Sequence, residues 1–194
     1  MMNTTSRSQG RQRAFYFDQR YCTACRACQI ACKDRHNLPV GVNWRRVETY
    51  ERGRFPRPRV YHLTLSCNHC ARPVCAEACP ADAISKREED GVVVLDSALC
   101  TGCRACLDAC PYGALQFDEA TGQVGKCDMC VDLVVRGEQP ACVAACTLRV
   151  LEAGWLNEMD DRGQELEAPD LPAPSLTGPS VRVRLHRDAT DAVR

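Results

Sequence analysis

Cysteine is the residue of this chain most able to do chemistry, and its sixteen copies fall into four groups of four. The groups, here called runs 1 to 4, are Cys22-Cys25-Cys28-Cys32, Cys67-Cys70-Cys75-Cys79, Cys100-Cys103-Cys106-Cys110 and Cys127-Cys130-Cys142-Cys146. Most neighbours within a run are separated by a few residues, an interval typical of metal ligands. A disulfide framework would instead spread its cysteines along a short secreted chain. The sequence therefore predicts a metal-binding protein.

Run 3 has the most specific spacing, Cys-x2-Cys-x2-Cys-x3-Cys followed by Pro111. In bacterial ferredoxins such a run gives three thiolates to one [4Fe–4S] cluster and its fourth thiolate to another. Zinc is the main alternative, because Cys-x2-Cys pairs also build zinc ribbons. A zinc site needs only two such pairs and does not require a third and fourth cysteine at these intervals. We therefore predict four [4Fe–4S] clusters with all sixteen cysteines as ligands.

The order of the runs predicts how they share clusters. Runs 2 and 3 are close in sequence and both end in Cys-Pro, whereas runs 1 and 4 lie outside them. We infer an α+β fold of two nested bacterial-ferredoxin-like modules, in which residues 60–118 are inserted within an outer module. The predicted ligand sets, here called quartets, are Cys22, Cys25, Cys28 and Cys146 (quartet I); Cys67, Cys70, Cys75 and Cys110 (quartet II); Cys100, Cys103, Cys106 and Cys79 (quartet III); and Cys127, Cys130, Cys142 and Cys32 (quartet IV).

Short helices and β-hairpins around the clusters must position these sulfurs. Helical spacing places Cys28 and Cys32 one turn apart on a helix over residues 26–36. Turn signals between apolar stretches predict two hairpins. The expected strands are residues 14–17, 60–66, 83–86 with 92–96, 114–117 with 123–125, and 150–155, and a second helix covers residues 131–136. Residues 40–59 form an insertion rich in Arg and Pro.

Composition sets the domain organisation and the possible partners. The 45% hydrophobic share includes the cysteines, so the remaining apolar residues are few and folding should depend on metal. We expect residues 1–13 to be a disordered tail, 14–157 the four-cluster domain, and 158–194 an extended, Pro-rich arm that lies on a partner or on the domain itself. Zero net charge predicts no nucleic-acid partner, and no apolar run is long enough to span a bilayer. We identify no export signal.

Several residues beside the runs could influence a cluster. The candidates for tuning reduction potentials are Arg26, Lys33, Arg72, Arg104 and Lys126, for which solvation at the surface is an equally good interpretation. Trp44, Arg45 and Arg46 could contact a partner or cover a cluster. His69 is expected beside a cluster or at the surface rather than as a ligand, and His36 has no cluster motif near it. No nucleophile–base pair or phosphate-binding loop is present, so we predict no catalytic residues.

The stretches 22–34, 66–96, 100–114 and 126–146 resemble the four-cluster iron–sulfur (B) subunits of the dimethyl sulfoxide reductase (molybdopterin oxidoreductase) family. The resemblance covers about residues 14–157 and is specific for the family but not for a substrate. In related nitrate reductase subunits a Trp replaces one cysteine of run 3; Cys103 keeps that ligand here. Thr147 stands where many relatives have Pro, which is expected to loosen the loop.

The resemblance implies an electron-transfer subunit of anaerobic respiration that is not itself an enzyme. Single electrons would pass between a molybdopterin catalytic subunit and a quinone-reactive membrane anchor. The chain would then be membrane-associated through its partners, more readily on the periplasmic face by co-export than on the cytoplasmic face. One alternative is the same relay serving a formate dehydrogenase, a polysulfide reductase or a sulfite-oxidising enzyme. Another is a zinc-stabilised interaction scaffold.

Overall fold

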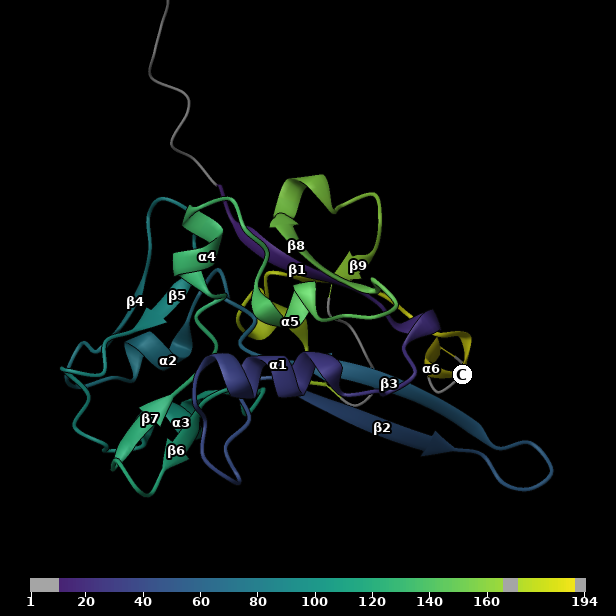
Figure 1. Cartoon of the computed structure of the whole chain (residues 1–194), viewed down its shortest axis with the longest axis horizontal. Coiled ribbons are helices and arrows are strands. Elements are labelled where there is room, and N and C mark those ends of the chain that lie inside the picture. Colours follow the sequence, from purple (N-terminus) through teal and green to yellow (C-terminus); the bar gives the residue numbers. More distant parts are fainter. Residues whose placement is uncertain (1–10, 166–170, 191–194) are drawn as a thin grey trace, which may run out of the picture.

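A computed structural model describes residues 11–165 and 171–190, and its central element is a four-stranded sheet in the order β8-β1-β10-β9 (Figure 1). The strands are β1 (Arg13–Asp18), β8 (Leu151–Trp155), β9 (Gln164–Glu165) and β10 (Val181–Arg184). β1 pairs antiparallel with β8 and parallel with β10. Because β1 is flanked on both sides, its apolar residues Phe15 and Phe17 are buried in the core.

Three two-stranded hairpins complete the β structure. They are β2 (Arg46–Arg52) with β3 (Arg59–Leu65), β4 (Ile84–Lys86) with β5 (Val93–Leu95), and β6 (Gln116–Asp118) with β7 (Gln123–Gly125). Both hairpins predicted from turn signals are confirmed. β2 was not predicted, since its charged residues resemble a surface loop. It pairs with β3 along its whole length, and the rings of Tyr50 and Tyr61 stack at 5.3 Å.

The helices are short, and most of them follow a cysteine loop. They are α1 (Ala27–Arg35), α2 (Val74–Glu77), α3 (Ala105–Ala109), α4 (Val131–Val135), α5 (Ala141–Ala144) and α6 (Arg187–Thr190). Single 3-10 turns occur at Gln19–Tyr21 (η1), Leu156–Glu158 (η2) and Pro174–Leu176 (η3). The predicted helices 26–36 and 131–136 correspond to α1 and α4. No helix in the described ranges is long and apolar enough to cross a membrane.

The carboxy-terminal residues differ from the predicted arm. β10 is an inner strand of the main sheet, with Val181 opposite Phe15 and Val183 opposite Phe17. Just before it, the Ser180 hydroxyl donates to the His69 carbonyl. This segment is therefore built into the fold and holds run 2. Within the predicted arm, residues 166–170 and 191–194 lie outside the described residues.

The predicted amino-terminal tail also needs correction at its end. Residues 1–10 lie outside the described range, but Arg13 already belongs to β1. The Gln12 amide donates to the carbonyls of His69 and Gly91, which fixes the backbone just ahead of the sheet.

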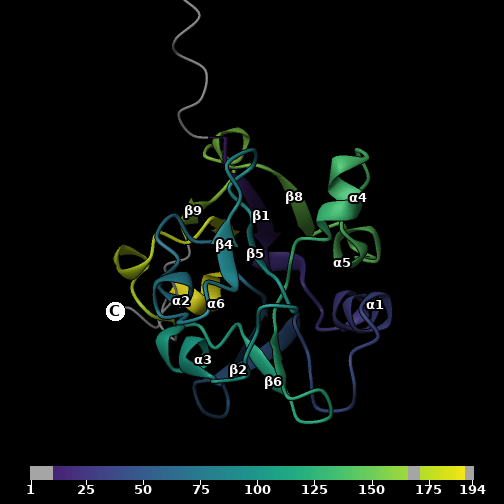
Figure 2. The ribbon, with the colours of Figure 1, turned by 90° about the vertical axis from the view of Figure 1, so that its left-hand side faces the viewer.

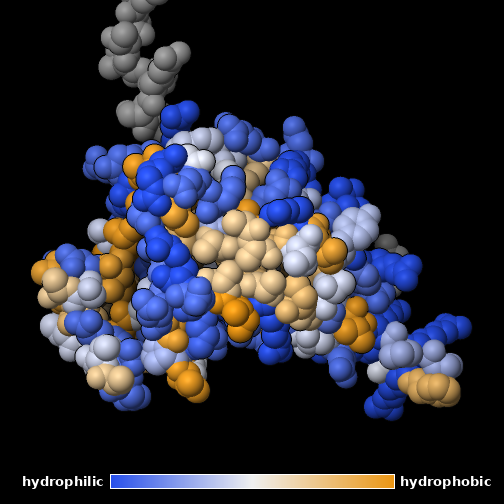
Figure 3. All heavy atoms as spheres, in the orientation of Figure 1, coloured by the Kyte–Doolittle hydropathy of each residue, from blue (hydrophilic) through white to orange (hydrophobic). Residues whose placement is uncertain are grey.

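The elements from α2 to β7 gather at one end of the molecule, and the β2–β3 hairpin projects at the other (Figures 1 and 2). Hydrophilic residues cover much of one face, while apolar residues gather over the region of α5 (Figure 3). The core contains many cysteines, among them Cys32, Cys67, Cys127 and Cys142. The sulfurs therefore occupy much of the interior that aliphatic side chains would otherwise fill.

Candidate metal centres

Quartets I and II each surround one cavity. The first cavity is lined by Cys22, Cys25, Cys28 and Cys146. The second is lined by Cys67, Cys70, Cys75 and Cys110. In both cavities three cysteines come from one run and the fourth from another run. The four cysteines of each predicted set therefore line one cavity.

The thiols of quartets III and IV interact in the same crossed pattern. Burial raises the pKa of Cys106 to about 11, and the neighbouring Cys79, Cys103 and Cys100 contribute to the rise. Burial likewise raises the pKa of Cys32 to about 12, with contributions from Cys142 and Cys130. Cys79 of run 2 thus lies with run 3, and Cys32 of run 1 lies with run 4.

All four cysteine loops share one backbone feature. The residue two positions after the first cysteine has a left-handed conformation, with φ of +54° at Ala24, +43° at His69, +70° at Gly102 and +60° at Met129. Such reversals turn backbone N–H groups toward one point and form nests that bind anions. The Met129 N–H donates to the Cys127 sulfur at 3.3 Å.

These features fit a [4Fe–4S] cluster. Four thiolates make such a site negative, and N–H groups directed at sulfur offset that charge while four soft ligands supply the iron coordination. When bound, these clusters supply one-electron redox chemistry. A zinc site does not require the third cysteine that follows a second Cys-x2 interval in runs 1 and 3.

Two family models describe the same residues. One, a 4Fe-4S dicluster domain, matches residues 59–156, and the other, a 4Fe-4S binding domain, matches residues 21–38. The B chain of anaerobic dimethyl sulfoxide reductase from Escherichia coli K12 is 40% identical over 182 residues, which cover 89% of this chain and 88% of that protein. The present chain therefore belongs to that family of iron–sulfur subunits. The family predicted from the motifs is confirmed, and with it an electron-transfer role that is not itself catalytic.

Two further relatives act with other substrates. The formate dehydrogenase iron-sulfur subunit of Wolinella succinogenes is 37% identical, covering 72% of this chain and 80% of that protein. The B subunit of sulfite dehydrogenase from Allochromatium vinosum is 34% identical, covering 77% of this chain and 71% of that protein. The family therefore does not fix the substrate of a catalytic partner.

Arg45 is buried in this iron–sulfur subunit, although its sequence left a partner contact and a cluster cover equally open. It is 2% exposed, and its neighbours Trp44 and Arg46 are partly buried. Burial lowers the pKa of Arg45, but the thiolates of Cys142, Cys127 and others outweigh burial and raise it. The alternative of a partner contact is thus wrong for Arg45.

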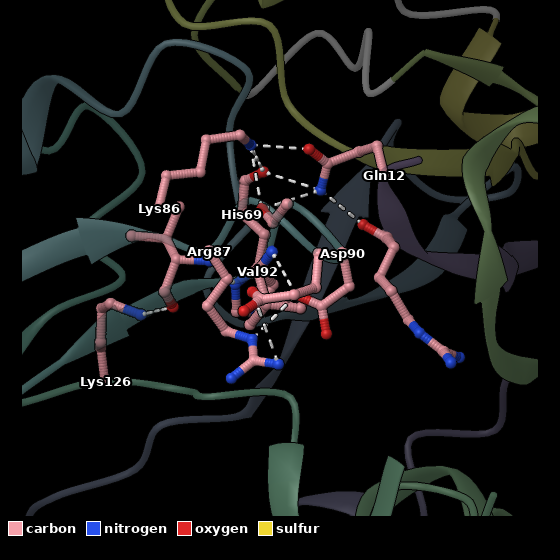
Figure 4. Close-up of polar contacts among 11 residues, drawn as sticks. Gln12, His69, Lys86, Arg87, Asp90, Val92 and Lys126 are labelled. Carbon is pink, nitrogen blue, oxygen red and sulfur yellow. Dashed lines mark hydrogen bonds and ion pairs between the residues drawn. The ribbon is translucent and has the colours of Figure 1, made fainter. Parts of the chain in front are cut away.

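Lys126 and Lys86 are two more internal cations. Lys126 is 2% exposed and donates to the carbonyls of Val93 and Cys127. Lys86 donates to Gln12, at 2.6 Å, and to the carbonyl of Cys70, at 2.9 Å (Figure 4). Burial is the main cause that lowers the pKa of Lys86, and thiolates nearby oppose it. Both lysines tie a cysteine loop of the subunit to the β4–β5 hairpin.

The remaining predicted cations behave as surface residues. Arg26, Arg72 and Arg104 are exposed, and the Arg104 guanidinium lies 3.6 Å from the Phe117 ring centroid. Lys33 is partly exposed and donates to the Val42 carbonyl. Of the five candidates, Lys126 alone has the burial that a strong effect on a cluster requires.

The structure shows the surroundings of two histidines for which the sequence left more than one interpretation or none. His69 is fully buried, and its Nδ1 accepts a hydrogen bond from Val93 N–H, so the surface interpretation is wrong. Burial is the chief cause of the low pKa of His69, which keeps the ring neutral. The Nε2 atom of His36 lies 3.6 Å from the Cys130 sulfur, although no motif connects these residues.

Proposed function

We propose that this iron–sulfur subunit relays single electrons through four [4Fe–4S] clusters held by quartets I to IV. The proposal is supported by the two cavities that quartets I and II line and by the mutual influence of the thiols within quartets III and IV. Crossed sharing of this kind is the ligation pattern of two-cluster ferredoxins. Quartets I and IV would form the outer module, and quartets II and III the inner module inserted within it.

Electrostatic influences between thiols of different quartets support a linear order I–IV–II–III. Cys142 of quartet IV is among the thiols that act on Cys28 of quartet I. Cys67 of quartet II acts in the same way on Cys127 of quartet IV. Quartets II and III are joined by α2, which has Cys75 within it and Cys79 just after it. Electrons can therefore pass along one path.

The two ends of this path are the places where sulfur reaches the surface. Cys25 of quartet I and Cys103 of quartet III are exposed, and the other fourteen cysteines are buried or partly buried. The exposed side chain of Leu148 borders the cavity of quartet I. Exposed apolar residues beside a redox site suit a protein contact. We infer that electrons enter at one of these ends and leave at the other.

The partners follow from the family. A molybdopterin catalytic subunit would dock at one end and a quinone-reactive membrane anchor at the other, as the match to the dimethyl sulfoxide reductase relative supports. The subunit would be associated with the membrane through these partners, on the periplasmic face by co-export in preference to the cytoplasmic face. A formate or sulfite dehydrogenase is the second candidate for the catalytic partner, which the relatives named above favour.

Metal content tests the proposal directly. Anaerobically purified subunit should contain about 16 iron and about 16 acid-labile sulfide per chain, and dithionite should produce paramagnetic signals from four clusters. Cys103→Ser should remove or convert one cluster, whereas Thr101→Ala in the same loop should leave all four. Folded protein that holds zinc and no sulfide would refute the proposal. The substrate reduced or oxidised by a co-purifying molybdenum subunit would identify the catalytic partner.

A further inference from the structure

The guanidinium of Arg45 is buried without a carboxylate partner. Nη1 donates to the Thr64 hydroxyl at 3.1 Å, Nη2 donates to the Ser66 hydroxyl at 3.0 Å, and the group lies 4.4 Å from the Phe15 ring centroid. Nε is buried and has no hydrogen-bond partner within residues 11–165 and 171–190. No ion pair involving Arg45 occurs in those ranges. A buried, unpaired cation is strongly unfavourable unless negative charge lies close to it.

The negative charge available to Arg45 is sulfur from two quartets. The thiolates that act on its charge are Cys142, Cys127 and Cys32 of quartet IV and Cys28 of quartet I. Hydroxyl groups do not neutralise a cation, so the hydrogen bonds to Thr64 and Ser66 orient Arg45 but leave its charge to the sulfurs. Arg45 is thus placed where the two quartets adjoin.

Arg45 also lies beside one sulfur of each quartet. The Thr64 hydroxyl, which accepts from Arg45, lies 3.8 Å from the Cys28 sulfur and can donate to it. The backbone N–H of Arg45 opposes the rise in the pKa of Cys32 that burial causes, so it lies near that sulfur. Arg45 therefore reaches quartet I through Thr64 and quartet IV through its own backbone.

We propose that Arg45 is the internal counter-cation of quartets I and IV and raises the reduction potentials of the clusters bound there. The proposal rests on the function proposed above. Reduction adds one negative charge to a cluster, and a fixed cation in a low-dielectric interior favours the more negative state. Three of the four neighbouring thiolates belong to quartet IV. The increase in reduction potential should therefore be largest for the quartet IV cluster, smaller for the quartet I cluster and smallest for the clusters of quartets II and III.

Redox titration of the assembled complex, followed by electron paramagnetic resonance, tests this. Arg45→Gln keeps hydrogen-bond donors but removes the charge, and should lower the reduction equilibrium constant of the quartet IV cluster at least tenfold, about 59 mV for one electron. Arg45→Lys keeps the charge and should remain within threefold of wild type. The matched control is Arg57→Gln, which removes an exposed arginine from the turn between β2 and β3 and should change neither potential.

Iron content of each variant separates tuning from assembly. If Arg45→Gln binds fewer irons than wild type, Arg45→Lys decides, because it keeps the positive charge and changes only the hydrogen-bonding group. It should keep the iron content and the potentials of wild type. The proposal is overturned if Arg45→Gln retains its iron with unchanged potentials, if its shift equals that of Arg57→Gln, or if Arg45→Lys loses as much iron or shifts the potentials as far as Arg45→Gln. A wild-type protein without iron would instead refute the proposed function.

Discussion

The hydroxyl oxygen of Thr147 lies 3.8 Å from the sulfur of Cys25, the exposed cysteine of quartet I. The Ala27 N–H and then this hydroxyl hold the pKa of Cys25 below its ordinary value. Thr147 directly follows Cys146, which lines the same cavity. The residue expected to loosen this loop therefore contributes a hydrogen bond between runs 4 and 1.

Replacing Thr147 should change the potential of the quartet I cluster. Thr147→Val keeps the shape but removes the donor, and hydrogen bonds to sulfur raise cluster potentials. We expect the reduction equilibrium constant to fall two- to tenfold, about 20–60 mV for one electron. Thr147→Ser should restore it. A redox titration with the quartet III signal as internal reference measures the shift, and an equal shift in Thr147→Ser would contradict the assignment.

Gly102 and Ala24 occupy equivalent left-handed positions in runs 3 and 1 but differ in the space around them. A Cβ on Gly102 would lie 2.2 Å from the Gly122 carbonyl oxygen, so Gly102→Ala must displace backbone. We expect it to destabilise the protein by about 2 kcal/mol or more and to reduce quartet III iron. Ala24→Gly should be neutral or stabilising by up to about 1 kcal/mol, because it relieves left-handed strain. Thermal unfolding and iron analysis of the two variants measure these changes. An equal loss of stability in Gly102→Ala and Ala24→Gly would contradict the steric argument.

Features set by nearby residues could be predicted from the sequence. The cysteine loops depend on intervals of a few residues, and the hairpins β4–β5 and β6–β7 depend on their own turn residues. The crossed grouping of Cys32 with run 4 and Cys79 with run 3 was predicted from the order of the runs together with the way bacterial ferredoxins share their fourth cysteine. Cysteine intervals, turn residues and the order of the runs can all be read from the sequence without knowledge of tertiary packing.

Features set by distant residues could not be predicted. β10 pairs with β1 although almost the whole protein lies between them in sequence, and its short Val-Arg alternation resembles many surface segments. Arg45 stands in an Arg-rich stretch where exposure is the usual outcome. Its burial becomes clear only when Thr64 and Ser66 are placed beside it.

Lys126 should contribute to stability through two buried hydrogen bonds. Its ammonium group donates to the carbonyls of Val93 and Cys127 and so joins β5 to run 4. Lys126→Met preserves much of the side-chain volume but leaves both carbonyls without this donor, at about 1–3 kcal/mol each. We expect a fall in Tm of several degrees in thermal unfolding of the iron-loaded subunit.

Lys33 is the matched control for Lys126. It also donates to two carbonyls, those of Pro39 and Val42, but it is partly exposed and water can replace its hydrogen bonds. Lys33→Met should therefore lower the free energy of unfolding by less than about 1 kcal/mol. If both variants lowered Tm equally, burial would not be the origin of the Lys126 contribution.

Asp18 should make stability depend on acid pH. Its carboxylate accepts from Arg20 Nε at 2.9 Å and Nη2 at 2.7 Å, and the Arg20 side chain is the main cause that lowers the pKa of Asp18 from 3.8. The stabilisation is fully present above pH 3.8 and is lost as pH falls through the lower folded pKa, because the unfolded state then binds the proton first.

Asp18→Asn should lower the free energy of unfolding by about 0.5–1 kcal/mol at neutral pH and by progressively less below about pH 4. Unfolding free energies measured from pH 3 to 7 test this, and a difference that stayed constant down to pH 3 would show that the carboxylate charge is not its source.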